Sequence, residues 1–270
     1  MRSVAGRITF ALLLAALTLT AWAAPAADTS GGAPAALVSE RTEALMLGGR
    51  QTLADLYGPE HPVSIGVIFV HGFMRDRTTF ADHARAVAAE GVMAVAPDLP
   101  YHTDSRRNAQ ALADLIGQLR DGRLGPPIER VVLVGFSAGG LSALLAADTP
   151  GVVGFVGLDP FDRPSGIGLD AARKLDKPAR LLRAPSGACN AFAISSPWGA
   201  ALKRLEGEHT IVKATHCDFE APTDALCELV CGRADAERQK IIRREILKAV
   251  RDWLQPAAAT AQTTTAQPAL

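Results

Sequence analysis

The fold of this chain is decided by the stretch Val131-Val132-Leu133-Val134-Gly135-Phe136-Ser137-Ala138-Gly139. An apolar, strand-forming run ends in Gly-x-Ser-x-Gly, and the small residues of 138–147 then favour a helix. A strand that turns this sharply into a helix holds its serine in a strained conformation, and glycines on both sides allow the close approach. Because the motif lies between a strand and a helix, we predict Ser137 to be a nucleophile raised at the carboxyl end of a sheet. The alternative is a glycine-rich turn with an incidental serine.

Further apolar runs and amphipathic patterns extend outward from this turn. The apolar runs suit strands buried on both faces, and the patterns between them suit helices. The expected strands are 63–70, 92–96, 131–135, 152–158, 179–184 and 210–214, the expected helices are 79–90, 105–120, 138–147, 168–175, 197–205 and 237–254, and 45–47 with 52–57 are expected antiparallel edge strands. Because strand and helix alternate, the sequence predicts an α/β fold with a mainly parallel, doubly wound sheet.

The two ends of the 270-residue chain differ in composition from its middle. Residues 1–23 carry two arginines, an apolar run and Ala21-Trp22-Ala23, the pattern of a secretory signal peptide. The apolar run is shorter than the ~20 residues of a spanning helix, so an uncleaved anchor is the weaker alternative. The segments 24–36 and 256–270 are expected to be disordered. This leaves 37–255 for one domain of a protein exported to the periplasm or beyond.

The charge balance bears on the kind of partner. Lys and Arg number 28 and Asp and Glu number 28, so the net charge is zero. Nothing in this balance draws the protein to nucleic acid or to an anionic membrane surface. We expect a small-molecule or polymeric neutral substrate, and the oligomeric state stays open.

All four cysteines, Cys189, Cys217, Cys227 and Cys231, lie in the last third of the chain. Export to an oxidising compartment predicts disulfides. Three pairings are possible, and a bond from Cys227 to Cys231 is the least favourable because both would sit one turn apart on one helix. A zinc site is the alternative, but paired Cys-x-x-Cys motifs and a suitably spaced histidine are missing from the sequence, so no metal is expected.

A serine nucleophile needs a base and donors for the oxyanion. In this kind of fold the base follows the nucleophile and the acid in the chain, and only His209 and His216 are available. His216 follows the expected last strand, whereas His209 precedes it and would lie at the opposite edge, so we predict His216. The expected oxyanion donors are the backbone N–H groups of Phe73 and Ala138, with Met74 as an alternative to Phe73.

The acid is expected at a strand end near His216. The segment after 179–184 contains no carboxylate, but the strand 152–158 ends directly before Asp159. We predict Asp159 as the acid, with Asp162 and Asp218 as reserves; an Asp-Pro turn is the purely structural explanation for Asp159. His216 would remove the Ser137 proton during attack on an acyl carbon, Asp159 would fix the imidazole tautomer, and water would cleave the acyl-enzyme without a cofactor.

Several motifs carry a family resemblance: Leu56-Tyr57-Gly58-Pro59, His71-Gly72-Phe73, Pro97-Asp98-Leu99-Pro100 and the serine turn. From Leu53 to Leu254 the chain resembles the α/β-hydrolase superfamily. Gly157-Leu158-Asp159-Pro160 resembles the acid-bearing segment of chlorophyllase-like hydrolases, a branch related to bacterial cutinase-like and polyester-degrading enzymes. The resemblance implies an esterase or lipase with Asp159 as the acid, and the short connection after Asp159 implies a minimal lid. A peptidase, a thioesterase, an acyltransferase or a non-catalytic binding protein are the alternatives.

Overall fold

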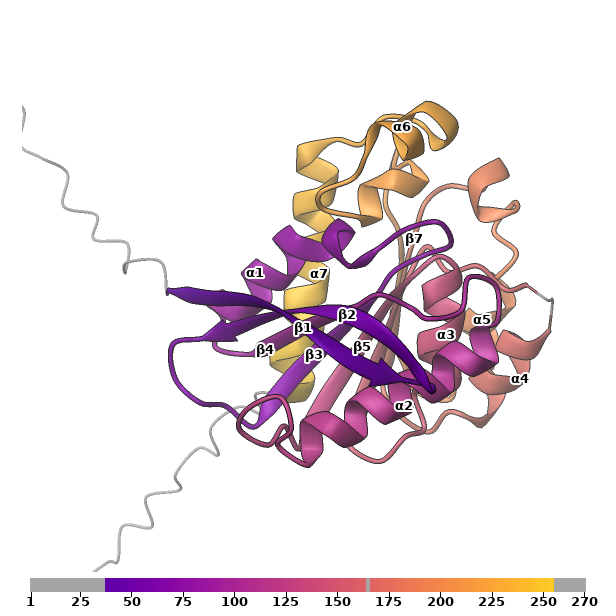
Figure 1. Cartoon of the computed structure of the whole chain (residues 1–270). Coiled ribbons are helices and arrows are strands. Elements are labelled where there is room, and N and C mark those ends of the chain that lie inside the picture. Colours follow the sequence, from indigo (N-terminus) through magenta and orange to yellow (C-terminus); the bar gives the residue numbers. More distant parts are fainter. Residues whose placement is uncertain (1–36, 164–165, 255–270) are drawn as a thin grey trace, which may run out of the picture. The chain divides into compact units, whose positions relative to one another are not determined.

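A single sheet of eight strands organises the residues that the computed structural model describes, 37–163 and 166–254 (Figure 1). The strand order is β1-β2-β4-β3-β5-β6-β7-β8. The predicted signal peptide, linker and tail, at 1–23, 24–36 and 256–270, lie outside the described residues, so they stay predictions.

The first part of the sheet is antiparallel and the rest is parallel. β1 (Val38–Leu47) and β2 (Arg50–Pro59) form a hairpin, and β2 pairs antiparallel with β4 (Met93–Pro97). All other neighbours pair in parallel. The remaining strands are β3 (Ile65–Val70), β5 (Arg130–Phe136), β6 (Val152–Leu158), β7 (Ala179–Arg183) and β8 (Leu205–Thr210). The mainly parallel sheet predicted from the sequence is confirmed.

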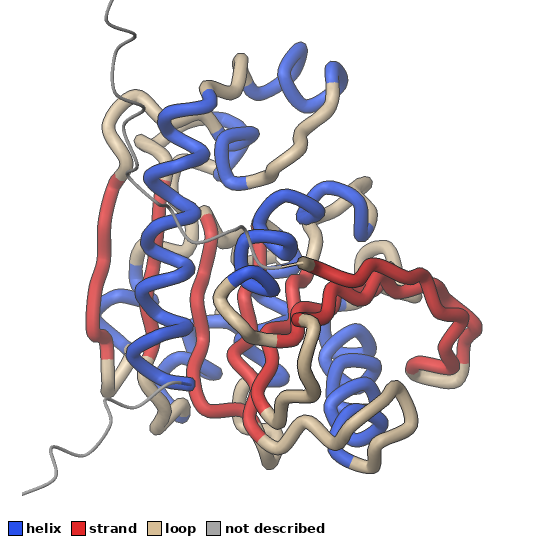
Figure 2. Tube along the Cα trace, turned by 90° about the vertical axis from the view of Figure 1, so that its left-hand side faces the viewer, coloured by secondary structure: helices blue, strands red, loops and turns tan. Residues whose placement is uncertain are grey.

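Helices cover both faces of the sheet, which explains why its central strands are apolar throughout (Figures 1 and 2). One face is packed by α1 (Ala81–Ala89) and α7 (Ala236–Leu254). The other is packed by α2 (Ser105–Arg120), α3 (Ala138–Ala146), α4 (Ile167–Lys174) and α5 (Pro197–Ala201). Each long helix buries one apolar stripe, for example Leu112, Leu115, Ile116 and Leu119 in α2. Along the described residues, none of the helices has the length and apolar content needed to span a bilayer.

The last strand is not where the sequence predicted it. The predicted strand 210–214 is wrong: β8 ends at Thr210, and Ile211 begins a turn in which Lys213 has φ 60°. The predicted helix 197–205 is also too long, since Leu205 already belongs to β8. The reason is that β8 is the outer strand of the sheet and is largely exposed, so its sequence lacks the apolar run that marks the buried strands. His209 lies near the carboxyl end of β8 with its side chain exposed, not before the last strand.

Short helices and loops gather beyond the carboxyl ends of the parallel strands. They include three 3-10 turns, η1 (Arg77–Phe80), η2 (Ala188–Asn190) and η3 (His216–Phe219), and the helix α6 (Ala225–Cys231), which stands at the top of Figure 1. Between β6 and β7 the described residues contain α4 and no separate lid domain. The predicted functional residues all come from this edge of the sheet or the loops above it.

Candidate active site

The turn between β5 and α3 has the strained geometry that its sequence predicts. Ser137 has φ 53° and ψ −125°, a region that side chains other than glycine rarely occupy. A Cβ atom on Gly139 would lie 2.2 Å from the His71 carbonyl oxygen, and one on Gly135 would lie 2.6 Å from the Gly139 carbonyl oxygen. Both glycines are therefore sterically required. The turn is also bonded to β6, because the Ser137 N–H donates to the Leu158 carbonyl over 3.0 Å.

Three side chains that lie far apart in the sequence form one hydrogen-bonded chain. His216 Nε2 lies 3.0 Å from Ser137 Oγ, and His216 Nδ1 lies 2.6 Å from Asp159 Oδ2. The Asp159 and His216 side chains are only 3% and 10% exposed, and the His216 ring packs 4.5 Å from that of Phe136. With Nδ1–H donated to the carboxylate, Nε2 is left free to accept the serine proton.

Asp159 is held on its second oxygen as well. Oδ1 accepts hydrogen bonds from the Ala184 backbone N–H at 3.1 Å and from Asn190 Nδ2 at 3.2 Å. Asn190 lies in η2, and its own Oδ1 accepts from the N–H groups of Gly187 and Ala193. Asn190 was not predicted from the sequence, because a polar amide after a strand end is a weaker signal of an active site than a carboxylate.

The two reserve carboxylates have other partners. Asp162 accepts from the N–H groups of Gly168 and Leu169 at the start of α4 and from Trp198 Nε1. Asp218 Oδ2 accepts from Arg238 Nε at 2.7 Å and from the Thr215 N–H. Each of them therefore stabilises a helix or loop and makes no hydrogen bond to His216.

His71 fixes the loop that carries the predicted oxyanion donors. Its Nε2 accepts from the Leu99 N–H at 2.8 Å, so the proton is on Nδ1, which donates to the Gly72 carbonyl at 2.8 Å. Burial lowers the pKa of His71, which keeps this ring neutral. The amide N–H groups of Phe73 and Ala138 have no acceptor among the described residues, and both residues line the cavity at Ser137. Met74 lines it too, with φ 57°.

Arg75 joins this loop to the segment that follows His216. Its guanidinium donates through Nε and Nη2 to the two carboxylate oxygens of Glu220, at 2.7 Å each, and through Nη1 to Asp224 at 2.8 Å. The Glu220 side chain is fully buried, so this bidentate pair is shielded from solvent. The pair connects the loop that carries Phe73 and Met74 to the segment between η3 and α6.

Comparison with known proteins identifies the family. The profile of the alpha/beta hydrolase family matches residues 67–263, most of the chain. The chain belongs to the α/β-hydrolase family. Among solved structures, it is similar to a protein assigned as a dienelactone hydrolase from Klebsiella pneumoniae subsp. pneumoniae (TM-score 0.61, 17% identity, 78% of this chain and 98% of that one). A dienelactone hydrolase from Anabaena variabilis is similar at TM-score 0.64 and 17% identity, over 80% and 98% of the two chains.

At this level of identity the two structures show the shared fold alone. No curated protein matches the sequence significantly. The predicted superfamily is confirmed for this α/β hydrolase, and the narrower resemblance to the chlorophyllase-like and cutinase-like branch stays a prediction.

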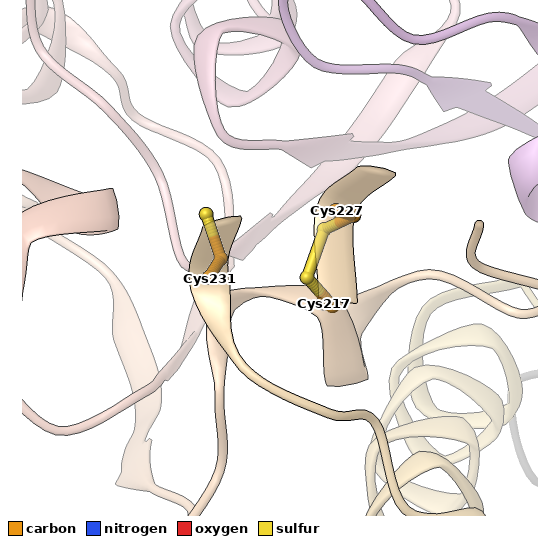
Figure 3. Close-up of side chains that lie close together, drawn as sticks. All are labelled: Cys217, Cys227 and Cys231. Carbon is orange, nitrogen blue, oxygen red and sulfur yellow. A yellow bond between two sulfur atoms is a disulfide. The ribbon is translucent and has the colours of Figure 1, made fainter. Parts of the chain in front are cut away.

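Two disulfides brace the loops around the site of this α/β hydrolase. Cys217 is bonded to Cys227, and Cys189 is bonded to Cys231. The predicted disulfides are thus present, and the disfavoured bond within α6 is avoided. Three of the sulfur atoms, on Cys217, Cys227 and Cys231, lie within 4.8 Å of one another (Figure 3). With both bonds formed none of them is a thiolate, the form that binds zinc.

A cavity of about 830 Å³ opens beside Ser137 in this α/β hydrolase. Its volume is within the range that holds a small organic ligand. Ser137, His216 and Phe73 line it together with Leu226 and Val230 of α6. A ligand bound in the cavity would thus contact both the serine hydroxyl and the helix above it.

Proposed function

We propose that this α/β hydrolase is an exported serine hydrolase that cleaves carboxylic esters, with Ser137 as nucleophile, His216 as base and Asp159 as the orienting carboxylate. The proposal rests on one observation: an unbroken chain of hydrogen bonds runs from the Ser137 hydroxyl through His216 to Asp159, at a strained turn that faces the cavity. This arrangement supplies the groups that acyl transfer through a serine needs.

The first half of the reaction forms an acyl-enzyme. As Ser137 Oγ attacks the ester carbonyl carbon, its proton passes to His216 Nε2, 3.0 Å away. The resulting imidazolium is stabilised by the Asp159 carboxylate at 2.6 Å. His216 then returns the proton to the leaving alcohol oxygen as the ester bond breaks.

The oxyanion of each tetrahedral intermediate would be bound by the N–H groups of Phe73 and Ala138. The Ala138 N–H is at the N-terminus of α3, where the helix dipole favours negative charge. His71 holds the Gly72 peptide that precedes the Phe73 N–H, so this donor is fixed before substrate binds. In the second half, His216 takes a proton from water as the water oxygen attacks the acyl carbon. The imidazolium then gives this proton to Ser137 Oγ as the acyl–oxygen bond breaks, which releases the acid and regenerates the serine hydroxyl.

Both similar structures are described as dienelactone hydrolases, and this description agrees with ester chemistry because a lactone is a cyclic ester. Export is supported by the two disulfides, since such bonds persist in oxidising compartments.

A panel of p-nitrophenyl esters with acyl chains of two to twelve carbons, assayed with the domain 37–255, tests the proposal. We expect turnover that Ser137→Ala abolishes, and labelling of Ser137 by a fluorophosphonate. Labelling without turnover of any ester would move the assignment to a peptidase, a thioesterase or an acyltransferase. A folded protein with neither labelling nor turnover would be a binding protein.

A further inference from the structure

The helix α6 forms one wall of the cavity at Ser137. Four of its seven residues line that cavity, two of them cysteines and the other two Leu226 and Val230. Leu229 does not line it and is 84% exposed. The helix therefore has a face toward the cavity and a separate outer face, and each carries large apolar side chains.

The cavity face of α6 leaves apolar surface in contact with solvent. Leu226 is 53% exposed and Val230 is 67% exposed. The loop after β3 carries two more such side chains on the same cavity, Phe73 at 51% and Met74 at 67% exposure. Large apolar side chains gathered around one concavity, rather than scattered singly, are typical of a ligand-binding surface.

The position of α6 is fixed from three directions, although a helix of seven residues is marginal by itself. Cys227 is bonded to Cys217, next to His216 (Figure 3). Cys231 is bonded to Cys189, next to the Asn190 that donates to Asp159. Asp224 caps the helix and pairs with Arg75. The apolar face is thereby held at a set distance from the nucleophile, as a binding wall requires.

We propose that Leu226 and Val230 are specificity-determining residues that bind the apolar chain of an ester whose carbonyl group lies at Ser137. The inference rests on the proposed function and names its substrate class: esters with an aliphatic chain on the acyl or the alcohol side. The chain would cover the surface that the two side chains leave exposed. Each methylene buried there would raise kcat/KM by about fourfold.

The residue chemistry of α6 favours a chain over a charged ligand. Glu228, the one charged residue within Ala225–Cys231, has its Oε1 bonded to the Ala234 N–H and does not line the cavity. Leu226 and Val230 are four residues apart on one helix face, which makes a continuous apolar strip. Such a strip contacts successive methylenes of an extended chain.

The test compares Leu226→Ser, Val230→Ser and the double variant with Leu229→Ser, a matched control on the outer face of the same helix. All three side chains are more than half exposed, so the substitutions bury no polar group and the melting temperatures should agree. The substrates are p-nitrophenyl esters with acyl chains of two to twelve carbons, and alkyl acetates with alcohols of one to eight carbons.

For each series we compare kcat/KM for the eight-carbon ester with kcat/KM for the shortest ester. In one of the two series, we expect this ratio to be at least about tenfold lower in the double variant than in the wild type. The shortest ester should change less than about twofold, and Leu229→Ser should match the wild type. The series that responds shows whether α6 binds the acyl or the alcohol side. Unchanged ratios in both series, or an equal response of Leu229→Ser, would overturn the proposal.

A second experiment distinguishes failure of the chain-binding proposal from failure of the proposed ester hydrolysis. It measures octanoate binding to Ser137→Ala, with and without the α6 substitutions, by calorimetry. If Leu226→Ser and Val230→Ser raise the octanoate Kd about tenfold in this background, while the protein with Ser137 intact hydrolyses none of the esters, ester hydrolysis is refuted but the chain-binding face stands. Equal octanoate affinity in every variant, together with unchanged ester ratios, would refute the face while ester hydrolysis stands.

Discussion

Asn190 Nδ2 donates a hydrogen bond to Asp159 Oδ1 over 3.2 Å, on the carboxylate oxygen that His216 does not contact. The carboxylate is thus held at both oxygens, and its orientation toward the imidazole is set by a side chain from the loop after β7. This relationship gives Asn190 a positioning role for the proposed reaction.

Asn190→Ala and Asn190→Asp separate positioning from loop structure. Removal of a donor to a charged group should lower kcat about tenfold with little change in KM. Asn190→Asp keeps the acceptor for the Gly187 and Ala193 N–H groups but sets a negative charge against Asp159. Asn190→Asp should therefore lower kcat more than Asn190→Ala does, and should lower the melting temperature less. The reverse order in kcat would show that Asn190 serves the loop alone.

Asp159→Asn should lower kcat by about 10⁴ while the protein stays folded, because the amide disfavours the tautomer that His216 needs. Asp162→Asn should instead lower the melting temperature, since Asp162 bonds the start of α4 and Trp198. Ester turnover and thermal unfolding of both variants check the assignment. An active Asp159→Asn beside an inactive but stable Asp162→Asn or Asp218→Asn would exclude Asp159 as the acid.

The two disulfides should contribute differently to stability. Cys189 and Cys231 are 42 residues apart and Cys217 and Cys227 are 10 apart. The loop-closure entropy of the unfolded chain then predicts losses of about 4 and about 3 kcal/mol in unfolding free energy for the paired serine variants. Urea unfolding of Cys189→Ser/Cys231→Ser and Cys217→Ser/Cys227→Ser measures both.

Activity assayed well below the unfolding transition adds a second readout for the same pairs. Cys217 is next to His216, so the Cys217→Ser/Cys227→Ser pair should also lose turnover of the shortest ester. The Cys189→Ser/Cys231→Ser pair should lose mainly the preference for long chains, because it frees the far end of α6. Full activity and unchanged stability in both pairs would contradict a bracing role.

Sequence patterns predicted the centre of this fold well because its strands are buried. β5 and β6 are continuous apolar runs next to a glycine-flanked turn, and local sterics at Ser137 fix the geometry in a few residues. The position of β8 was predicted wrongly because an exposed outer strand lacks the apolar run that identifies a buried strand. Its register is set by pairing with β7, and that is a tertiary interaction.

The predicted site residues Ser137, Asp159 and His216 could be named because their residue types and chain order are restrictive. Asn190, Arg75 and Leu226 could not, since each acts through contacts between segments distant in the chain. Whether an exposed leucine faces a cavity or solvent depends on how α6 is held, and the two disulfides that hold it had three possible pairings in the sequence.

His83 should make the protein less stable in acid. Its side chain is fully buried against Phe69 and Phe80, and burial, with the nearby Arg243 guanidinium, lowers the pKa of His83 from 6.5 to about 3. Between these values the unfolded chain binds a proton at this position and the folded chain does not. The free energy of unfolding is therefore unaffected by His83 above about pH 6.5 and decreases as the pH falls toward 3, because only the unfolded chain takes up the proton.

The slope from this one group reaches about 1.4 kcal/mol per pH unit in that window. His83→Phe cannot take up the proton, so its unfolding free energy should fall less steeply between pH 6 and pH 4 than that of the wild type. Urea unfolding at pH 7, 6, 5 and 4 measures both slopes, and an offset from repacking the larger ring shifts the whole curve without changing its slope. Parallel curves for the two proteins would show that His83 is already protonated in the fold, or that an opening of the packing between α1 and the sheet admits water to the ring.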